Sequence, residues 1–359
     1  SISVLVASVF VAPTFAAGNP NCTEVDGDYI VTFSKGAVVA NEIKNVNGRD
    51  VTPKFMYDEA VNGFAGFLTG AQVCNYKKRG NVLSVEADQE VSIQATQSGA
   101  TWGLDRVDQI DLPLSTAYSY VSAGAGVDAY VIDTGILGTH TEFTRRMKSG
   151  YSAIGSSKNT TDCNGHGTHV AGTIGGTLYG VAKAVSLIPV RVLDCRGSGT
   201  NSGVIAGINW AIKNHTTNKA VANLSLGGGI SSTLDTAINN LIKDGVTVVV
   251  AAGNSATNAC NSSPARVPGA VTVAASASND SIASFSNIGS CVDIIAPGVA
   301  ITSAWHTSTS ATNTISGTSM AAPHVAGAIA RGLSGGFSVL GVSTKSIAGY
   351  PLLYVDPAK

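Results

Sequence analysis

The chain has 359 residues, of which 44% are hydrophobic and 13% are charged, and its formal net charge is −1. A near-neutral chain without a basic run argues against a nucleic-acid-binding protein, which needs a cationic face for phosphates. The apolar content argues against a disordered chain. The length allows one large domain of about 250–300 residues together with a small one, or two to three domains of ordinary size. We therefore expect a globular, soluble protein with no nucleic-acid partner.

The first segment, residues 2–12 (ISVLVASVFVA), is an apolar run that is followed by small residues at Ala16 and Ala17. This pattern is typical of a secretory signal peptide, which we predict to span residues 1–17. The run is well short of the ~20 residues of a transmembrane helix, and no other stretch qualifies. We therefore expect a secreted, extracellular protein that is not inserted in a membrane. A buried element at the edge of a domain is the alternative.

Asn-x-Ser/Thr sequons fit secretion and predict a glycoprotein. The chain has them at Asn21, Asn159, Asn214, Asn223, Asn261 and Asn279. Because Asn223 lies in an apolar strand candidate, we expect it to stay unmodified.

Residues 28–94 carry most of the short, charged segments. Residues 29–33 (YIVTF), 63–68 (GFAGFL) and 82–93 are predicted strands, and residues 70–79 are a predicted helix. Strands that alternate with helical stretches over such a short length predict a small α+β domain.

After residue 94 the chain contains longer apolar strands that end in glycine-rich turns. The predicted strands are residues 128–132, 185–192, 220–226 and 246–252, and the predicted helices between them are residues 202–213 and 234–243. Near-continuous Val, Ile and Ala runs are typical of strands that are buried on both faces. We therefore predict an α/β fold with a mostly parallel sheet and helices on both faces.

Three polar residues lie at strand ends or at the helix starts that follow. Asp133 ends a strand, and His166 and Ser319 each lie where a loop enters a helix rich in small residues. In an open α/β sheet, ligands bind outside the carboxyl ends of the strands. Backbone N–H groups at a helix start lack intrahelical partners and favour an anion. Because proline is tolerated in a first helical turn, Pro323 is predicted to lie in the first turn of its helix.

An aspartate, a histidine and a serine together predict nucleophilic catalysis. A serine hydroxyl is a weak nucleophile until a base removes its proton, and neutral histidine is such a base near pH 7. A buried aspartate fixes the imidazole tautomer and stabilises the imidazolium. The chain order Asp133, His166, Ser319 is that of the subtilisin arrangement.

Three segments carry a resemblance to a known family, namely DTG at 133–135, HGTHVAG at 166–172 and GTSMAAPHVAG at 317–327. They resemble the signature motifs of subtilisin-like serine proteases, and residues 95–332 are similar to the proteinase K and aqualysin branch. The resemblance implies a serine endopeptidase that needs no cofactor for catalysis. It also implies that the Asn254 side chain and the Ser319 N–H form the oxyanion hole.

Each of these residues also has another interpretation. Asp133 could cap a turn, and Ser319 could be a helix N-cap. His166 and His169 could bind a metal, which makes a metal-dependent hydrolase one alternative, although Gly167 stands where the zincin motif requires glutamate. The other alternative is a catalytically silent family member that binds proteins.

Glycine-rich segments match the parts of the family that bind substrate. Residues 197–199 and 225–229 match segments that pair with an extended peptide as added β-strands. The primary pocket is expected between residues 225–228 and 251–253. Neither stretch carries a carboxylate, which predicts broad specificity with a preference for large apolar or aromatic side chains. The predicted substrate-binding residues are Gly197, Ser198, Gly199, Ser225, Leu226, Gly227, Gly228, Ala251, Ala252 and Gly253.

The N-terminal region resembles the propeptide of the family. This resemblance implies a propeptide of residues 18–94 that inhibits the enzyme and assists its folding, self-cleavage after Gln94, and a catalytic domain of residues 95–359. A large parallel sheet has many non-local contacts and folds slowly, so a domain that templates folding is physically reasonable. An independent binding module is the alternative. The expected partners are protein and peptide substrates and the propeptide, and the expected state is a monomer.

Four cysteines after residue 94 allow three pairings, and export permits disulfides. The pairs that the resemblance implies are Cys163–Cys195 and Cys260–Cys291. A reactive thiol at Cys163 is the alternative, because His166 is close in sequence. The two cysteines before residue 95, Cys22 and Cys74, could pair with each other.

The resemblance further implies a structural Ca²⁺ ion. Its ligands would be the carbonyl groups of Pro268 and Ala270 and the carboxylate of Asp293, which are hard oxygen ligands of the kind that Ca²⁺ prefers.

The C-terminal tail departs from the family. Gly332, Gly335 and Gly336 follow one another closely, and glycine is costly inside a helix. Residues 351–354 (PLLY) are similar to the usual closing segment of the family, but the connection to them is short. The packing of the tail and a second calcium site therefore do not follow from the resemblance.

Overall fold

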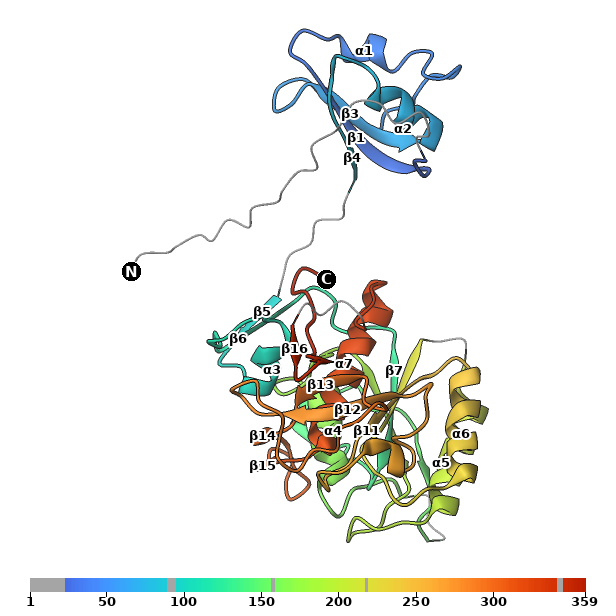
Figure 1. Ribbon diagram of the computed structural model, residues 1–359, viewed down its shortest axis with the longest axis vertical. Coiled ribbons are helices and arrows are strands. Elements are labelled where there is room, and N and C mark those ends of the chain that lie inside the picture. Colours follow the sequence, from blue (N-terminus) through green and yellow to red (C-terminus); the bar gives the residue numbers. More distant parts are fainter. Residues whose placement is uncertain (1–22, 89–94, 156–158, 217–218, 341–344) are drawn as a thin grey trace. The chain divides into compact units, whose positions relative to one another are not determined.

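The computed structural model describes residues 23–88, 95–155, 159–216, 219–340 and 345–359 (Figure 1). Contacts divide the chain into two compact units, residues 1–91 and 92–359. The predicted signal peptide, Asn21 and Cys22 lie outside the described residues. None of the described helices is long and apolar enough to cross a membrane.

The first unit is an antiparallel sheet in the order β2-β3-β1-β4. Its core contains aromatic side chains from both strands and helix, among them Phe33, Phe64 and Tyr76. Thr69 and Gln72 form a capping box at the start of the longer helix. The elements are β1 (Gly27–Phe33), α1 (Val39–Glu42), β2 (Phe55–Tyr57), β3 (Gly63–Leu68), α2 (Gly70–Lys77) and β4 (Val82–Ala87). Helix α2 and strand β4 are thus shorter than the helix over residues 70–79 and the strand over residues 82–93 that the sequence predicts.

The second unit is built on a seven-stranded sheet in the order β13-β12-β11-β10-β7-β9-β8, in which all strand pairs are parallel. The predicted α/β fold with a parallel sheet is thereby confirmed. Its strands are β7 (Asp128–Asp133), β8 (Tyr151–Ser152), β9 (Ser186–Arg191), β10 (Ala220–Leu224), β11 (Thr247–Ala251), β12 (Val271–Ser276) and β13 (Ile294–Pro297).

Alternate residues of the sheet enter two different hydrophobic cores. In β7, Ala129 and Val131 face the core of α4 and α7, whereas Tyr130 and Ile132 face the core of α5 and α6 (Figure 1). Burial on both faces explains why these strands read as continuous apolar runs. The helices are α4 (His166–Gly175), α5 (Asn201–Asn214), α6 (Ser232–Lys243) and α7 (Thr318–Gly335).

The second unit also contains shorter elements, and six of their strands form the two-stranded pairs β5-β6, β14-β15 and β16-β17. These elements are β5 (Ala95–Ser98), α3 (Trp102–Val107), β6 (Ala117–Tyr120), η1 (Thr141–Phe143), η2 (Ala259–Asn261), β14 (Ile301–Ala304), β15 (Thr312–Ile315), β16 (Ser346–Ile347) and β17 (Tyr350–Pro351).

Helix α7 contains a proline beyond its first turn. Pro323 follows the start of the helix at Thr318 by more than one turn, so the prediction that it lies in the first turn is wrong. Proline has no N–H, which leaves the carbonyl group of Ser319, four residues earlier, without its helical donor. The hydroxyl group of Ser225 donates to this carbonyl oxygen at 2.8 Å. A side chain from another segment therefore compensates for the proline.

The tail glycines have a packing reason. Helix α7 continues through Gly332 to Gly335, and Gly336 follows in a left-handed conformation with φ of 74°. A β-carbon at Gly332 would lie 2.6 Å from the carbonyl oxygen of Phe337. Beyond it, Leu353 is buried, and its N–H donates to Ile295 of β13. The closing segment therefore packs at the edge of the sheet.

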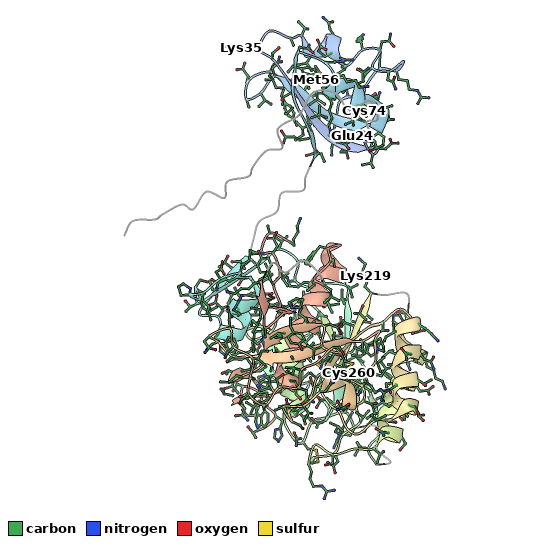
Figure 2. All side chains as sticks on the ribbon, viewed as in Figure 1. Glu24, Lys35, Met56, Cys74, Lys219 and Cys260 are labelled. Carbon is green, nitrogen blue, oxygen red and sulfur yellow. A yellow bond between two sulfur atoms is a disulfide. The ribbon has the colours of Figure 1, made fainter. Side chains whose placement is uncertain are left out.

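Two disulfides connect loops of the second unit. They are Cys163–Cys195 and Cys260–Cys291, the pairs that the resemblance implies, and Cys163 is therefore not a free thiol. Cys74 of the first unit (Figure 2) is also disulfide-bonded, whereas its expected partner lies outside the described residues.

The described sequons differ in exposure. Asn223 lies in β10 and is 1% exposed, which agrees with the expectation that it stays unmodified. The exposed sequons are Asn159, Asn214, Asn261 and Asn279.

Candidate active site

Asp133 and His166 form a hydrogen-bonded pair at the carboxyl edge of the sheet. Asp133 is the last residue of β7 and is fully buried, and His166 is the first residue of α4. His166 Nδ1 lies 2.8 Å from Asp133 Oδ1 and 2.9 Å from Asp133 Oδ2. Because a carboxylate only accepts hydrogen bonds, the neutral imidazole carries its proton on Nδ1. Nε2 is then free to accept a proton.

The surroundings of His166 raise its pKa above the ordinary value. Burial has the largest effect and lowers the pKa, but the charge of Asp133, its hydrogen bond and the charge of Asp162 together outweigh burial. The imidazolium form is thus stabilised at the position where a general base would become protonated.

Asp162 is a buried carboxylate that sequence reasoning missed. Its oxygens accept hydrogen bonds from the hydroxyl group of Thr134, the N–H groups of Asn164 and Gly165, and both the N–H and the hydroxyl of Thr168. Burial alone would raise the pKa of Asp162, but these hydrogen bonds lower it. Asp162 therefore ties the end of β7 to the start of α4. The available signal was an aspartate in the turn-forming run DCNG.

Ser319 lies at the start of α7 and exchanges hydrogen bonds with Ser225. Ser319 Oγ donates to the Ser225 carbonyl at 3.1 Å, and Ser225 Oγ donates back to the Ser319 carbonyl. Asn223 Nδ2, in buried β10, donates to Ser225 Oγ at 2.9 Å. Within the described residues, no hydrogen bond joins Ser319 to His166. Such bonds are often long or poorly aligned in free enzymes and tighten when substrate binds.

The side chain of Asn254 is oriented by the first residue of α7. Asn254 Oδ1 accepts hydrogen bonds from the N–H and the hydroxyl of Thr318 at 2.8 and 2.9 Å. Its amide N–H₂ group is left without a partner among the described residues, as is the N–H of Ser319 in the first turn of α7. Thr318 was not among the predicted site residues, and only its position beside Ser319 could have indicated its role.

A cavity of about 290 Å³ lies beside Ser319 and Asn254. The primary pocket was expected between residues 225–228 and 251–253, and all of these residues except Ser225 line this cavity. None of its lining residues carries a formal charge. They are Leu226, Gly227, Gly228, Ala251, Ala252, Gly253, Asn254, Ser255, Ser262, Asn287, Thr318 and Ser319.

Asn287 shapes one wall of this cavity and was also missed. Its Oδ1 accepts hydrogen bonds from the N–H groups of Ser255 and Thr257, and its Nδ2 donates to the Ala252 carbonyl. A β-carbon at Gly253, where φ is 102°, would lie 2.4 Å from this Nδ2. No local sequence pattern connects Asn287 with the loop that it orders.

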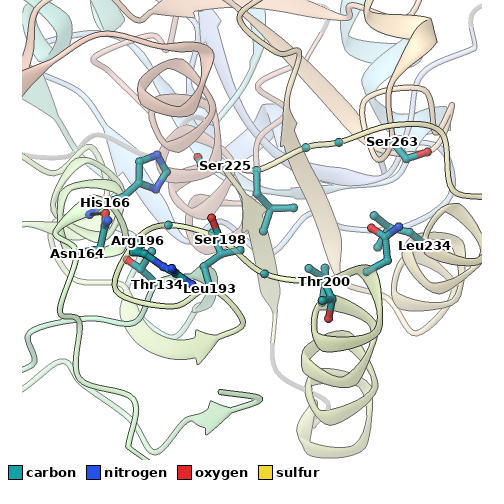
Figure 3. Close-up of a pocket in the computed structure, with 17 residues that line it drawn as sticks. Thr134, Asn164, His166, Leu193, Arg196, Ser198, Thr200, Ser225, Leu234 and Ser263 are labelled. Atoms are coloured by element: carbon teal, nitrogen blue, oxygen red, sulfur yellow. Dashed lines mark hydrogen bonds between the residues drawn. The ribbon is translucent and has the colours of Figure 1, made fainter. Parts of the chain in front are cut away.

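A second cavity of about 480 Å³ adjoins His166 (Figure 3). Both predicted peptide-binding segments line it, so the structure brings together residues 197–199 and 225–228. Its lining residues are Thr134, Asn164, His166, Leu193, Arg196, Gly197, Ser198, Gly199, Thr200, Asn201, Val204, Ser225, Leu226, Gly227, Gly228, Leu234 and Ser263.

Residues 124–340, more than half of the chain, match the model of the subtilase family. The chain belongs to the subtilase family. This subtilase is 60% identical over 275 residues to an extracellular serine proteinase of Thermus sp. (strain Rt41A), in an alignment that covers 77% of this chain and 67% of the relative. It is 50% identical over 329 residues to alkaline serine exoprotease A of Vibrio alginolyticus, with coverages of 87% and 61%.

The chain thus spans about two thirds of the length of these two relatives. A solved structure, that of a cold adapted subtilisin-like serine proteinase, is 50% identical and superposes with a TM-score of 0.68 over 72% of this chain and 98% of that chain. The family, the fold and the enzyme class that the motifs predict are confirmed, and this subtilase is a serine endopeptidase.

The two histidines of the HGTH segment do not face a common ligand. His166 Nδ1 is bonded to Asp133, whereas His169 Nε2 lies 2.9 Å from the Ile301 carbonyl. His169 is fully buried, and burial lowers its pKa to about 4. In this subtilase His169 is therefore a buried core residue, which disfavours a metal-dependent hydrolase in which His166 and His169 bind the metal.

The expected calcium ligands lie at the amino ends of β12 and β13, at the edge of the sheet opposite to His166. The Asp293 carboxylate accepts a hydrogen bond from the N–H of Thr272 at 2.8 Å, and the N–H of Asp293 donates to the Thr272 carbonyl. Burial raises the pKa of Asp293, and a cation would favour its charged form. Two carbonyl groups and a carboxylate are hard oxygen donors of the kind that Ca²⁺ prefers, and they would form part of its coordination shell.

Proposed function

We propose that this subtilase is a secreted, extracellular endopeptidase in which Asp133, His166 and Ser319 form the catalytic triad. The observation that carries this proposal is the Asp133–His166 hydrogen bond, which leaves Nε2 of His166 as a base at the cavity that Ser225, the hydrogen-bond partner of Ser319, also lines. The relative from Thermus sp., which is named an extracellular serine proteinase, and the two disulfides support secretion.

The reaction follows from this arrangement. Ser319 Oγ attacks the carbonyl carbon of the peptide bond while His166 Nε2 takes its proton, and Asp133 stabilises the imidazolium. His166 then passes the proton to the leaving amine, which gives an acyl-enzyme on Ser319. Water, deprotonated by His166, hydrolyses this ester and regenerates the hydroxyl group. The complete set of groups supports an active enzyme over a silent binding protein.

Asn254 supplies one donor of the oxyanion hole, and the Ser319 N–H supplies the other. We expect Asn254→Ala to lower kcat by roughly 10²–10³-fold with little change in KM, because a preorganised donor acts mainly on the transition state. Steady-state kinetics on a peptide anilide would measure this. Asn254→Asp keeps the acceptor for Thr318 but has no N–H, so it should lose at least as much. Full activity of Asn254→Asp would contradict the assignment.

Substrates bind as an extended strand between residues 197–199 and 225–228, and the uncharged 290 Å³ cavity takes the side chain before the scissile bond. We expect Ala-Ala-Pro-Phe p-nitroanilide to be cleaved roughly 10- to 100-fold more efficiently than the peptide that ends in lysine. Burying the aromatic ring is favourable by about 1.5–3 kcal/mol. None of the described residues that line the cavity has a carboxylate that could pair with a lysine ammonium group. Equal kcat/KM values, or activity that survives a sulfonyl fluoride, would refute this function.

The N-terminal unit acts as a propeptide, and the enzyme is a zymogen that cleaves itself after Gln94. The support is the separate α+β unit before Ala95. The mature monomer would then begin with β5. N-terminal sequencing of the secreted protein should give Ala95, and a mature protein that begins within the first unit would contradict this processing.

A structural Ca²⁺ ion binds to Asp293, Pro268 and Ala270 and stabilises the fold. We expect a chelator to lower the Tm by about 5 to 10 °C, since a ligand at 100 times its Kd adds about 2.7 kcal/mol. Asp293→Asn should remove this difference, whereas Asp111→Asn, at an exposed carboxylate, should keep it. Thermal scans with and without Ca²⁺ measure the effect, and an Asp293→Asn variant that still responds would disprove the site.

A further inference from the structure

Arg196 gives the substrate cleft its charge. Among the described residues that line the two cavities, it is the only lysine, arginine, aspartate or glutamate. Its side chain is 86% exposed, so it is accessible to a bound peptide. An otherwise uncharged cleft with one cation at its rim attracts acidic groups of the substrate.

The backbone that carries Arg196 is fixed beside the catalytic histidine. Asp194 accepts the N–H of Arg196 at 2.8 Å, and the neighbouring Cys195 is joined to Cys163. Asn164, two residues before His166, donates its side-chain amide to the Cys195 carbonyl at 3.1 Å. The position of the Arg196 backbone relative to the start of α4 is therefore held by covalent and hydrogen bonds.

The guanidinium group keeps donors for a second carboxylate. Its Nε and Nη2 both contact a single oxygen of Asp194, at 3.3 and 3.2 Å. Its Nη1 has no partner among the described residues. Because the donors of a guanidinium form a planar fork, Arg196 can hold Asp194 on one side and bind a substrate carboxylate on another.

The place of Arg196 in the cleft selects one substrate position. In Figure 3 it lies with Asn164 and His166 at one end of the second cavity, whereas Leu234 and Thr200 lie at the other end. Successive side chains of an extended peptide point to opposite sides. When the residue before the scissile bond fills the 290 Å³ cavity, the side chain of the preceding residue points away from it, toward His166 and Arg196.

We propose that Arg196 makes this subtilase prefer peptides with an acidic side chain at the second residue before the scissile bond. The preference rests on the proposed function, because it concerns the same cleft. It names a substrate class within the broad apolar specificity: chains with glutamate or aspartate followed by a large apolar residue.

The test compares matched peptide anilides in the full enzyme. The anilides of Ac-Ala-Ala-Glu-Phe and Ac-Ala-Ala-Gln-Phe differ only in the charge of the second residue before the scissile bond. We expect the Glu/Gln ratio of kcat/KM to be about 3 to 10 in the wild type, near 1 in Arg196→Gln and below 1 in Arg196→Glu. The wild-type ratio should also decrease in about 1 M NaCl, because salt screens exposed charges.

Two controls make the result specific. Lys213→Gln removes an exposed cation at the end of α5, outside both cavities, and should keep the wild-type ratio. A second peptide pair carries the Glu/Gln change at the fourth residue before the scissile bond. An unchanged ratio in Arg196→Gln, an equal drop in Lys213→Gln, or an effect at the fourth position alone would overturn the proposal. Cleavage of the glutamine peptide tests the proposed function separately.

Discussion

Replacing Ser319 with alanine is expected to lower kcat by roughly 10⁶-fold while KM changes little. The substitution removes the nucleophile but leaves the 290 Å³ cavity and the oxyanion donors in place. A residual acceleration of roughly 10³–10⁴ over water should therefore remain. Anilide hydrolysis at saturating and limiting substrate separates the two constants.

The same substitution should abolish self-cleavage, so the variant must first be released from its N-terminal segment by immobilised wild-type enzyme. Both proteins are then compared as the same mature chain. Ser334→Ala, near the other end of α7, is the matched control and should remain active. Undiminished activity of the mature Ser319→Ala protein would mean that another residue is the nucleophile.

Asp133→Asn is expected to lower kcat by roughly 10⁴-fold, because the imidazole then loses the partner that fixes its tautomer. It should also change the pH profile. In the wild type, kcat/KM rises as His166 loses its proton, with a midpoint above the ordinary histidine pKa, because Asp133 and Asp162 outweigh burial. Without the Asp133 charge, burial lowers the pKa of His166, and the acid limb of the profile moves to lower pH.

The chain offers a matched control for this experiment. Asp244 forms another Asp–His pair, with Nδ1 of His215 at 2.8 Å, and neither residue lines the cavities at the active site. Asp244→Asn should therefore leave kcat and the pH profile of the enzyme unchanged. An Asp133→Asn variant whose acid limb stays at the wild-type pH would show that His166 does not owe its raised pKa to Asp133.

The sheet and the triad could be predicted because their signals are local. Runs such as VTVVVAA mark strands that are buried on both faces, and the strand end at Asp133 and the helix starts at His166 and Ser319 follow from short motifs. Helix bounds were predicted to within one or two residues. The starts of α5 and α6 are set by the side-chain caps of Thr200 and Ser231.

The missed features depend on contacts between distant segments. Asn287 orders the loop after β11 from a loop far along the chain, and Asp162 gains its role from Thr134 and Thr168. Pro323 was predicted to lie in the first turn because a proline deeper in a helix leaves a carbonyl group of that helix without its donor. The Ser225 hydroxyl that replaces this bond becomes visible only when β10 and α7 are seen together.

The central claim is that Ser319 is a nucleophile that His166 and Asp133 activate. Mass spectrometry of the enzyme after treatment with phenylmethylsulfonyl fluoride tests it most directly, because the reagent transfers its sulfonyl group to an activated serine hydroxyl. We expect one adduct per active molecule, on the peptide that contains Ser319, forming much more slowly in Asp133→Asn. An inactivated enzyme whose adduct lies on any other residue would contradict the account.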